Sequence, residues 1–171
     1  MACGDITTGR LKQCKQYQGG NTNLFLFNYV ENPFTVTAGQ ATAINPLLTA
    51  VYKFELTGNG NTFEENLVGA RNEGTIVNTQ TITTVLKGMD AATSVELNEL
   101  VKGYPMAVIQ DRNGVYHALG IDDGIDFSIV ASSGGAKTDM NGYTLTGVAE
   151  TKDYSPKLDT ATITAFLALV A

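Results

Sequence analysis

Apolar and polar residues alternate along much of this chain with the two-residue period of β-strands. In Val51–Thr57, Tyr52, Phe54 and Leu56 alternate with more polar neighbours, which predicts a strand with one buried and one solvated face. Leu24–Val30 is apolar at nearly every position. This run predicts a strand that is buried on both faces.

The longest β-forming run is Thr75–Leu86, which is longer than an average strand. Tyr104–Gln110 and Val115–Leu119 flank the turn sequence Asp111-Arg112-Asn113-Gly114 and therefore predict a β-hairpin. Turns or loops are expected at Gly120–Gly124 and Ser132–Lys137. Further strands are expected at Phe34–Val36, Ala41–Ile44, Thr62–Val68, Ile125–Ala131, Tyr143–Ala149 and Ala161–Val170.

One segment, Thr93–Lys102, predicts a short amphipathic α-helix. Thr93 and Glu96 have the spacing of a capping box, and Gly103 stands where a left-handed residue would end the helix. We expect the apolar face of this helix to lie across a sheet or against a neighbouring subunit. That face consists of Leu97, Leu100 and Val101.

These elements predict one domain of the mainly β class, over residues 1–171. We expect an antiparallel β-sandwich or barrel with one short flanking α-helix. The glycine- and asparagine-rich segment Gly58–Gly74 predicts a long protruding loop or hairpin. Residues 1–20 are polar and end in Gly19-Gly20, which predicts an extended N-terminal arm before the β-rich body of residues 21–171.

The composition favours a β-protein with low surface charge. The chain has 22 threonines and 18 glycines, and only 16% of its residues are charged. Seventeen acidic against 11 basic residues give a formal charge of -6. An acidic balance argues against a groove that binds nucleic acid by neutralising phosphates.

No apolar run is long enough to span a bilayer, and Met1–Gly20 lacks the apolar segment of a secretion signal, so we expect synthesis in the cytosol. Cys3 and Cys14 are the only cysteines, and no other cysteine or histidine near them in sequence completes a zinc site. Two free thiols are the simpler expectation, and a disulfide formed after release from the cell is the alternative.

Residues with catalytic potential are few. His117 is the only histidine, and its place in a hairpin strand favours a structural role. Asp122-Asp123-Gly124-Ile125-Asp126 lacks the spacing of a calcium loop and favours a turn over a weak ion site. Glu64 and Glu65 would point to opposite faces of a strand and so would not converge on a substrate. We expect no enzymatic activity, cofactor or small-molecule substrate.

The order of elements from Phe63 to Glu150 resembles that of tail tube proteins of tailed bacteriophages. The runs that carry the resemblance are Glu-Glu-Asn-Leu at 64–67, Ile-Val-Asn-Thr-Gln-Thr-Ile-Thr-Thr-Val-Leu at 76–86, Ser-Val-Glu-Leu-Asn-Glu-Leu at 94–100, Met-Ala-Val-Ile-Gln-Asp-Arg-Asn-Gly at 106–114 and Asp-Met-Asn-Gly-Tyr-Thr-Leu-Thr-Gly at 139–147. They also look like structural proteins of phages that infect Bacteroidetes. The resemblance covers about half of the chain, and residues 1–50 are the least typical part.

The resemblance implies a virion protein of the phage tail, assembled in the host cytoplasm. Members of that family form hexameric rings that stack into the tube through which the genome is ejected. It therefore implies a homo-oligomer that contacts other tail proteins and an acidic lumen along which DNA slides without specific binding. The segment Gly58–Gly74 would reach the next ring. The candidate residues for this contact are Asn59, Asn61, Glu64, Glu65, Arg71 and Glu73.

Two other classes fit the composition. A capsid decoration, head-completion or other virion protein would share the threonine-rich, weakly charged chain. A cellular binding module needs a ligand, and the absence of tryptophan disfavours a sugar platform.

Overall fold

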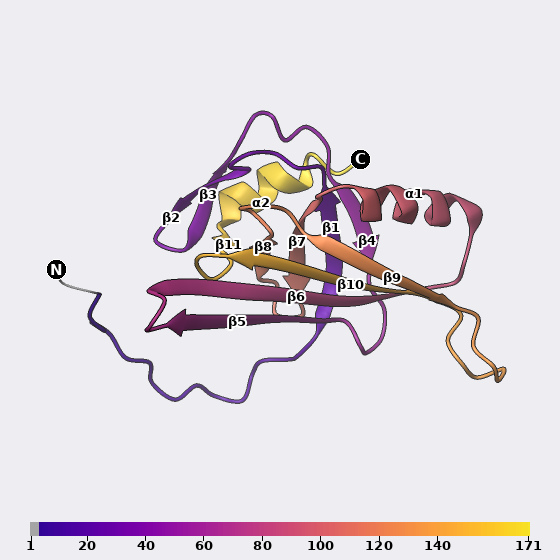
Figure 1. Ribbon diagram of the computed structural model, residues 1–171, viewed down its shortest axis with the longest axis horizontal. Helices are drawn as coiled ribbons and strands as arrows, with labels where there is room; N and C mark the ends of the chain where they lie inside the picture. The colour runs from indigo at the N-terminus through magenta and orange to yellow at the C-terminus, as the bar shows by residue number, and fades with distance from the viewer. Residues whose placement is uncertain (1–3) are drawn as a thin grey trace.

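The computed structural model describes residues 4–171, which form two β-sheets and two α-helices (Figure 1). The larger sheet has seven strands, and all of its pairs are antiparallel except β11 with β3. Its order is β2 (Phe34–Thr37), β3 (Gln40–Ile44), β11 (Lys157–Leu158), β8 (Tyr116–Leu119), β7 (Met106–Asp111), β1 (Asn21–Phe27) and β4 (Tyr52–Glu55).

The smaller sheet has four long antiparallel strands. Its order is β5 (Thr62–Ala70), β6 (Thr75–Lys87), β10 (Gly142–Thr151) and β9 (Asp126–Ser132). The β5–β6 hairpin closes at residues 71–74, and the loop 133–141 joins β9 to β10. In the register of β6, Thr75 pairs with Ala70 and Lys87 pairs with Gly142. The hairpin tip and the β9–β10 loop therefore lie at opposite ends of this sheet.

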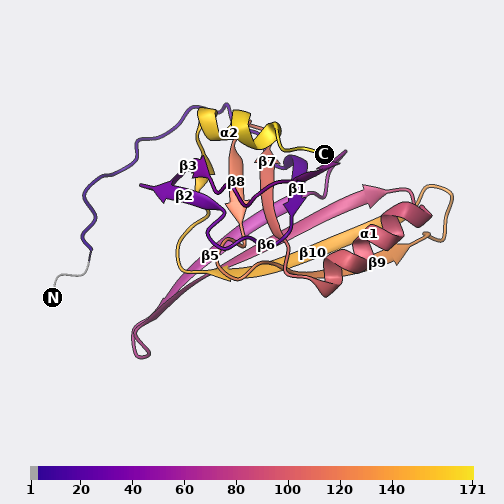
Figure 2. The ribbon, with the colours of Figure 1, turned by 90° about the horizontal axis from the view of Figure 1, so that it is seen from above.

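The two sheets and helix α2 (Thr160–Leu167) form three layers, with the seven-stranded sheet in the middle (Figure 2). Strand β1 explains this arrangement, because its side chains are buried on both sides. Leu24 and Leu26 pack toward the four-stranded sheet, among Ile82 and Leu145. Its two phenylalanines pack toward the aromatic ring of Phe166 on α2.

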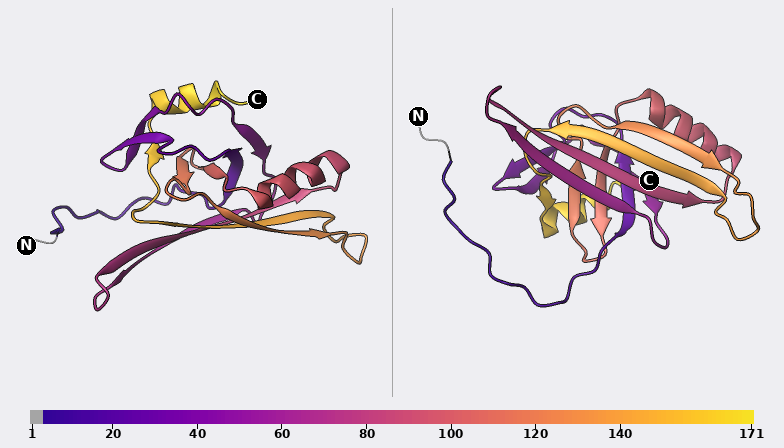
Figure 3. Two further views of the ribbon diagram at one scale, coloured as in Figure 1. Left: turned by 45° about the horizontal axis from the view of Figure 1, so that its top comes forward. Right: turned by 60° about the horizontal axis from the view of Figure 1, so that its bottom comes forward.

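The sequence-based assignment to the mainly β class is confirmed. The two sheets pack face to face, and neither closes into a barrel. The expected β-hairpin at residues 104–119, the double-sided burial of β1 and the length of β6 are also confirmed. The hairpin β5–β6 extends beyond the seven-stranded sheet (Figure 3), as expected of a protruding segment.

Helix α1 (Ala91–Lys102) starts two residues earlier than expected, and its cap differs. Asp90 is the N-cap, and its carboxylate accepts the Thr93 backbone N–H at 2.8 Å and the Thr93 hydroxyl at 2.7 Å. Thr93 therefore lies inside the first turn. The N-cap is therefore Asp90, three residues before the Thr93 that the capping-box spacing indicated. Gly103 has φ -98°, so it is not a left-handed cap.

Helix α2 was not expected, because Ala161–Val170 was predicted to be a strand. The segment is rich in β-branched residues, which misled the propensity argument. Asp159 caps the helix by accepting the Thr162 N–H at 2.7 Å, and Phe166 is fully buried one turn further on. A cap together with a tertiary contact therefore outweighs local β-propensity here.

Candidate assembly surface

Within residues 4–171, one face of the four-stranded sheet carries no second layer. Side chains alternate along its strands, so one set enters the core and the other stays exposed or partly exposed. In β6, Asn78, Gln80, Ile82 and Thr84 are buried, and the residues between them form the open face. The open face is mostly threonine, serine and valine: it includes Thr62, Asn66, Val68, Thr79, Thr81, Thr83, Thr144, Thr146, Val148, Ser128, Val130 and Ser132.

The charges on this open face are mainly negative. Glu64, Asp126 and Glu150 belong to the exposed set. Lys87, at the end of β6, contributes a positive charge to the same face. Glu64 pairs with Thr81, which pairs with Val148, which pairs with Asp126. One straight row across the sheet thus has a carboxylate on each outer strand and small side chains between them.

Among the residues that the structure describes, the two outer strands of this sheet have no hydrogen-bonded partner on their outer side, and helix α1 lies beside β9 (Figure 3). Strand β5 has nine residues and β9 has seven, and each pairs on one side only. Long unpaired edges are a template for pairing with another chain. In the order β5-β6-β10-β9, β5 and β9 run in opposite directions, so β5 of one copy can meet β9 of another in antiparallel pairing.

The six residues expected at an inter-ring contact lie in different places. Arg71 and Glu73 are exposed in the hairpin tip. Asn59 is exposed in the turn before β5, at the other end of the hairpin, and Glu64 is on the open face. The structure therefore does not bring these residues together in one surface.

Asn61 and Glu65, the remaining two, make contacts inside the subunit. Asn61 is buried, and its side-chain oxygen accepts the Val85 N–H at 2.9 Å. Asn61 also accepts a hydrogen bond from Asn21 at 3.3 Å through its backbone oxygen. No local sequence pattern indicates these contacts, because both partners are distant in the chain.

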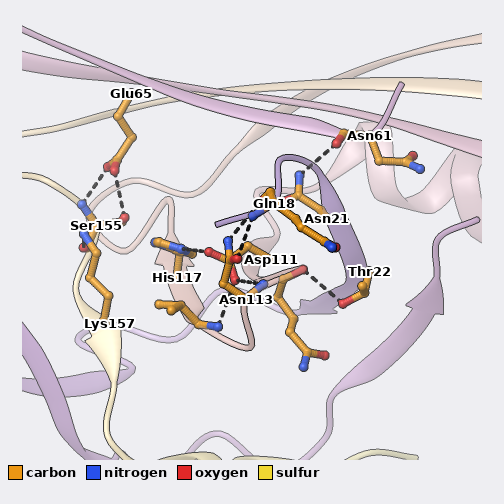
Figure 4. Close-up of polar contacts among 12 residues, drawn as sticks. Gln18, Asn21, Thr22, Asn61, Glu65, Asp111, Asn113, His117, Ser155 and Lys157 are labelled. Carbon is orange, nitrogen blue, oxygen red and sulfur yellow. Dashed lines mark hydrogen bonds and ion pairs between the residues drawn. The ribbon is translucent and has the colours of Figure 1, made fainter. Parts of the chain in front are cut away.

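Glu65 joins the four-stranded sheet to the segment before β11 (Figure 4). Its carboxylate also accepts hydrogen bonds from Asn78 at 2.9 Å and Gln80 at 3.0 Å. Burial alone would raise the pKa of Glu65, but the hydrogen bonds from Ser155, Asn78 and Gln80 outweigh it and hold the pKa below its usual value. The carboxylate is therefore charged at neutral pH and acts as an internal brace.

His117 lies between the sheets, with its ring 5.1 Å from that of Phe63. Its Nε2 is 3.4 Å from Asp111 Oδ2, and its Nδ1 is buried without a partner among the described atoms. Burial lowers the pKa of His117 despite the nearby Asp111 carboxylate. The ring is therefore neutral at pH 7, and this geometry favours the structural role expected from sequence.

Asp111 also shapes the β7–β8 turn. Its Oδ1 accepts the N–H groups of Asn113 and Val115 at 2.8 and 2.9 Å. Asn113 in turn exchanges two hydrogen bonds of 2.9 Å with the backbone of Gln18 (Figure 4). This turn therefore anchors the root of the N-terminal arm.

A groove of about 380 Å³ separates α1 from the edge strand β4. Its apolar lining includes Phe54 of β4 and two leucines of α1, Leu97 and Leu100. Leu97 belongs to the core, and Leu100 is partly buried against it. Val101 departs from the expected apolar face, because it is 49% exposed. The helix is thus only partly covered by its own subunit.

The remaining candidates offer no clear chemistry. Residues 121–123 form a turn, and Asp126 is the first residue of β9; Gly124 between them has φ 83°, which a side chain would strain. Within residues 4–171, no three side chains of His, Cys, Asp or Glu are grouped as metal ligands. Cys14 is exposed in the arm, while Cys3 lies outside the described residues, so the state of this pair stays a prediction.

No protein-family model matches the chain, and neither a curated protein nor a solved structure shows significant similarity to it. The fold alone defines a mainly β protein with two face-to-face sheets. Neither α1 nor α2 has the length and apolar character that crossing a membrane requires.

Proposed function

We propose that this chain is a virion structural protein, a subunit of a phage tail tube that forms stacked hexameric rings around the ejected genome. The observation that carries the proposal is the four-stranded sheet, which combines a small-residue, net-negative open face with two long unpaired edges. This combination suits a wall between subunits and a lumen.

Ring closure would pair β5 of one subunit with β9 of the next. The pairing is antiparallel, like every other pair in this sheet. A closed ring removes both exposed edges, which otherwise invite open-ended aggregation. The seven-stranded sheet and α2 would then lie outside the wall, because they cover its other face.

The open face would line the lumen. Its three carboxylates, Glu64, Asp126 and Glu150, repel the phosphate backbone, and its small side chains keep the surface smooth. DNA would therefore slide without being bound. In this proposal, the acidic balance of the chain, expected from sequence to repel DNA, would act through these three carboxylates.

Stacking of rings would use the two ends of the same sheet. The tip at residues 71–74 lies at one end and the loop 133–141 at the other, so a head-to-tail stack brings the tip of one ring to the loop of the next. The 13 residues of β6 span about 40 Å when fully extended. Strand tilt in a closed wall shortens the axial repeat to about 28–33 Å.

Electron microscopy of the purified protein at high concentration tests the proposal. We expect six-fold rings and stacks with this axial repeat. Monomers or trimers that never polymerise would contradict it, and trimers would favour a capsid decoration role instead. The variant Asn66→Pro blocks pairing at the edge of β5, and Asn59→Pro in the preceding turn is its matched control. Rings that form equally well with Asn66→Pro would also contradict the proposal.

A further inference from the structure

The N-terminal arm, residues 4–20, leaves the body with almost no contacts. Residues 4–19 are all exposed, and Ile6 and Leu11 are 97% and 87% exposed. The arm is held at its root by Asn113, which bonds Gln18, and by Arg112, whose N–H donates to the Gly20 oxygen. Large aliphatic side chains that are this exposed favour burial against another surface.

The arm is also basic in an acidic protein. It carries Arg10, Lys12 and Lys15 against the single carboxylate of Asp5, while the chain as a whole has a formal charge of -6. Leu11 stands between two of these cations. A short stretch of the arm therefore offers one apolar side chain together with two positive charges.

The groove between α1 and β4 has the complementary properties. Its floor is apolar, and its rim includes three tyrosines that are 48–65% exposed: Tyr29, Tyr52 and Tyr104. Two carboxylates of α1, Glu96 and Glu99, also line it. Glu99 pairs with Lys102 at 2.7 Å, whereas Glu96 forms no ion pair with the residues described. Strand β4 adds a free sheet edge along the groove.

The subunit's own arm is directed away from this groove. The arm joins the body at the start of β1, beside the β7–β8 turn, whereas the groove lies at the end of β1, where Leu26 and Phe27 contribute to its lining. Figures 1 and 2 show the arm running away from α1. A neighbouring copy is therefore the natural source of an arm for each groove.

We infer that the groove between α1 and β4 binds the N-terminal arm of a second copy of this chain, with Leu11 in the apolar floor and its flanking cations beside Glu96 and Glu99. The extended arm can pair with the free edge of β4 as an added strand. This inference deepens the proposed function, since it rests on self-assembly, but it needs neither tubes nor a lumen.

Charge reversal in the full-length chain tests this contact. Arg10→Glu with Lys12→Glu should weaken self-association by about tenfold, and Glu96→Lys with Glu99→Lys should do the same. Combining both pairs should restore it. Lys152→Glu, at an exposed position outside both the arm and the groove, is the control and should change nothing. Sedimentation velocity gives the association constants. The inference would be overturned if the two losses of affinity added in the combined variant, or if neither pair of substitutions weakened self-association.

Disulfide trapping separates exchange between copies from folding back. One partner is a Cys3→Ser chain that keeps Cys14; the other is a Cys3→Ser, Cys14→Ser chain with Tyr104→Cys. We expect a mixed disulfide between them under mild oxidation. Tyr154→Cys is a matched control, because Tyr154 is 55% exposed outside the groove. Equal trapping by Tyr104→Cys and Tyr154→Cys would overturn the inference. So would a single chain carrying both Cys14 and Tyr104→Cys that forms the disulfide only within itself.

The two proposals fail separately. Trapped dimers without rings or tubes would contradict the tail tube and leave arm exchange standing. Tubes that form equally well when either charge pair is reversed alone, and no trapping at Tyr104→Cys, would contradict arm exchange and leave the tail tube standing.

Discussion

Glu65 on β5 and Ser155, 90 positions later in the chain, are joined by two hydrogen bonds: the Ser155 N–H donates to Oε1 at 2.6 Å, and its hydroxyl donates to Oε2 at 2.9 Å. This contact fastens the outer strand of the four-stranded sheet to the segment that enters β11. Edge strands are the least supported parts of a sheet. Glu65 therefore fixes the position of an edge on which the proposed ring closure depends.

We predict that Glu65→Gln lowers the free energy of unfolding by about 1–3 kcal/mol, because the amide cannot accept all the donors that face the carboxylate. Glu64→Gln is the matched control, since the neighbouring side chain is exposed on the opposite face, and we expect a change within about 0.5 kcal/mol. Urea unfolding measures both. The gap between wild type and Glu65→Gln should shrink as the pH falls below the usual glutamate pKa. Equal effects of the two substitutions on the free energy of unfolding would contradict the stabilising role of the Glu65 hydrogen bonds.

His117 gives the protein a defined response to mild acid. Because its pKa is lowered in the folded state, the unfolded chain binds the proton more readily. Its contribution to stability is complete above the unfolded pKa, about 6.5, and is lost as the pH falls from there through the lower folded pKa. His117 is the only histidine, so this window can be assigned to it. Stability measured from pH 7 to 5 should fall in wild type and stay flatter in His117→Gln. If the stability of wild type and of His117→Gln changed with pH in parallel, the His117 ring would not be buried away from water.

Leu97 and Val101 lie on the expected apolar face of α1 but differ in burial. Leu97→Ala should cost about 2–5 kcal/mol, because Leu97 is 4% exposed within the main core. Val101→Ala, on the same helix, should cost less than about 1 kcal/mol in the monomer. Thermal or urea unfolding below the assembly concentration distinguishes them. A large loss with Val101→Ala would mean that this residue is covered within the subunit.

The hairpin tip should govern stacking without affecting the fold. Deleting residues 59–73 would remove the whole of β5, so the sharper change replaces residues 71–74 by Asn-Gly, which suits a two-residue hairpin turn. We expect folded subunits and rings but no long stacks in electron micrographs. Arg71→Ala with Glu73→Ala keeps the tip length and shows whether its charges contribute. Long tubes from the shortened hairpin would refute the inter-ring role.

The open face should set how freely DNA moves through the assembled tube. Glu64→Lys, Asp126→Lys and Glu150→Lys together should slow DNA ejection, because the lysines attract phosphates. The control places the same charge change at Glu31, Asp123 and Asp153, which are exposed outside this face. The slowing should weaken as salt is raised. Ejection kinetics equal to those of the control would count against the sliding surface.

Much of the β-structure followed from local pattern. The β7–β8 hairpin was predictable because strand periodicity on both sides met a turn sequence at residues 111–114. The double burial of β1 was predictable because no polar position interrupts Leu24–Phe27. The exposed arm followed from the polar character of residues 1–20, whose described part makes few contacts.

The candidate site depended on contacts that no local pattern contains. Asn61 and Glu65 are asparagine and glutamate in a polar stretch, and only their distant partners show that they are internal. The groove likewise needs α1 and β4, which are separated by two long strands in sequence.

By itself, the sequence determined where the chain extends and turns, since side-chain periodicity and turn residues act over a few positions. The tertiary structure decided that residues 160–167 are helical, because Phe166 is buried among Phe25, Phe27 and Phe34, and a cap at Asp159 starts the helix. It also decided that Glu64, Asp126 and Glu150 share one open face. Their strands are distant in sequence, and only hydrogen-bonded register aligns them.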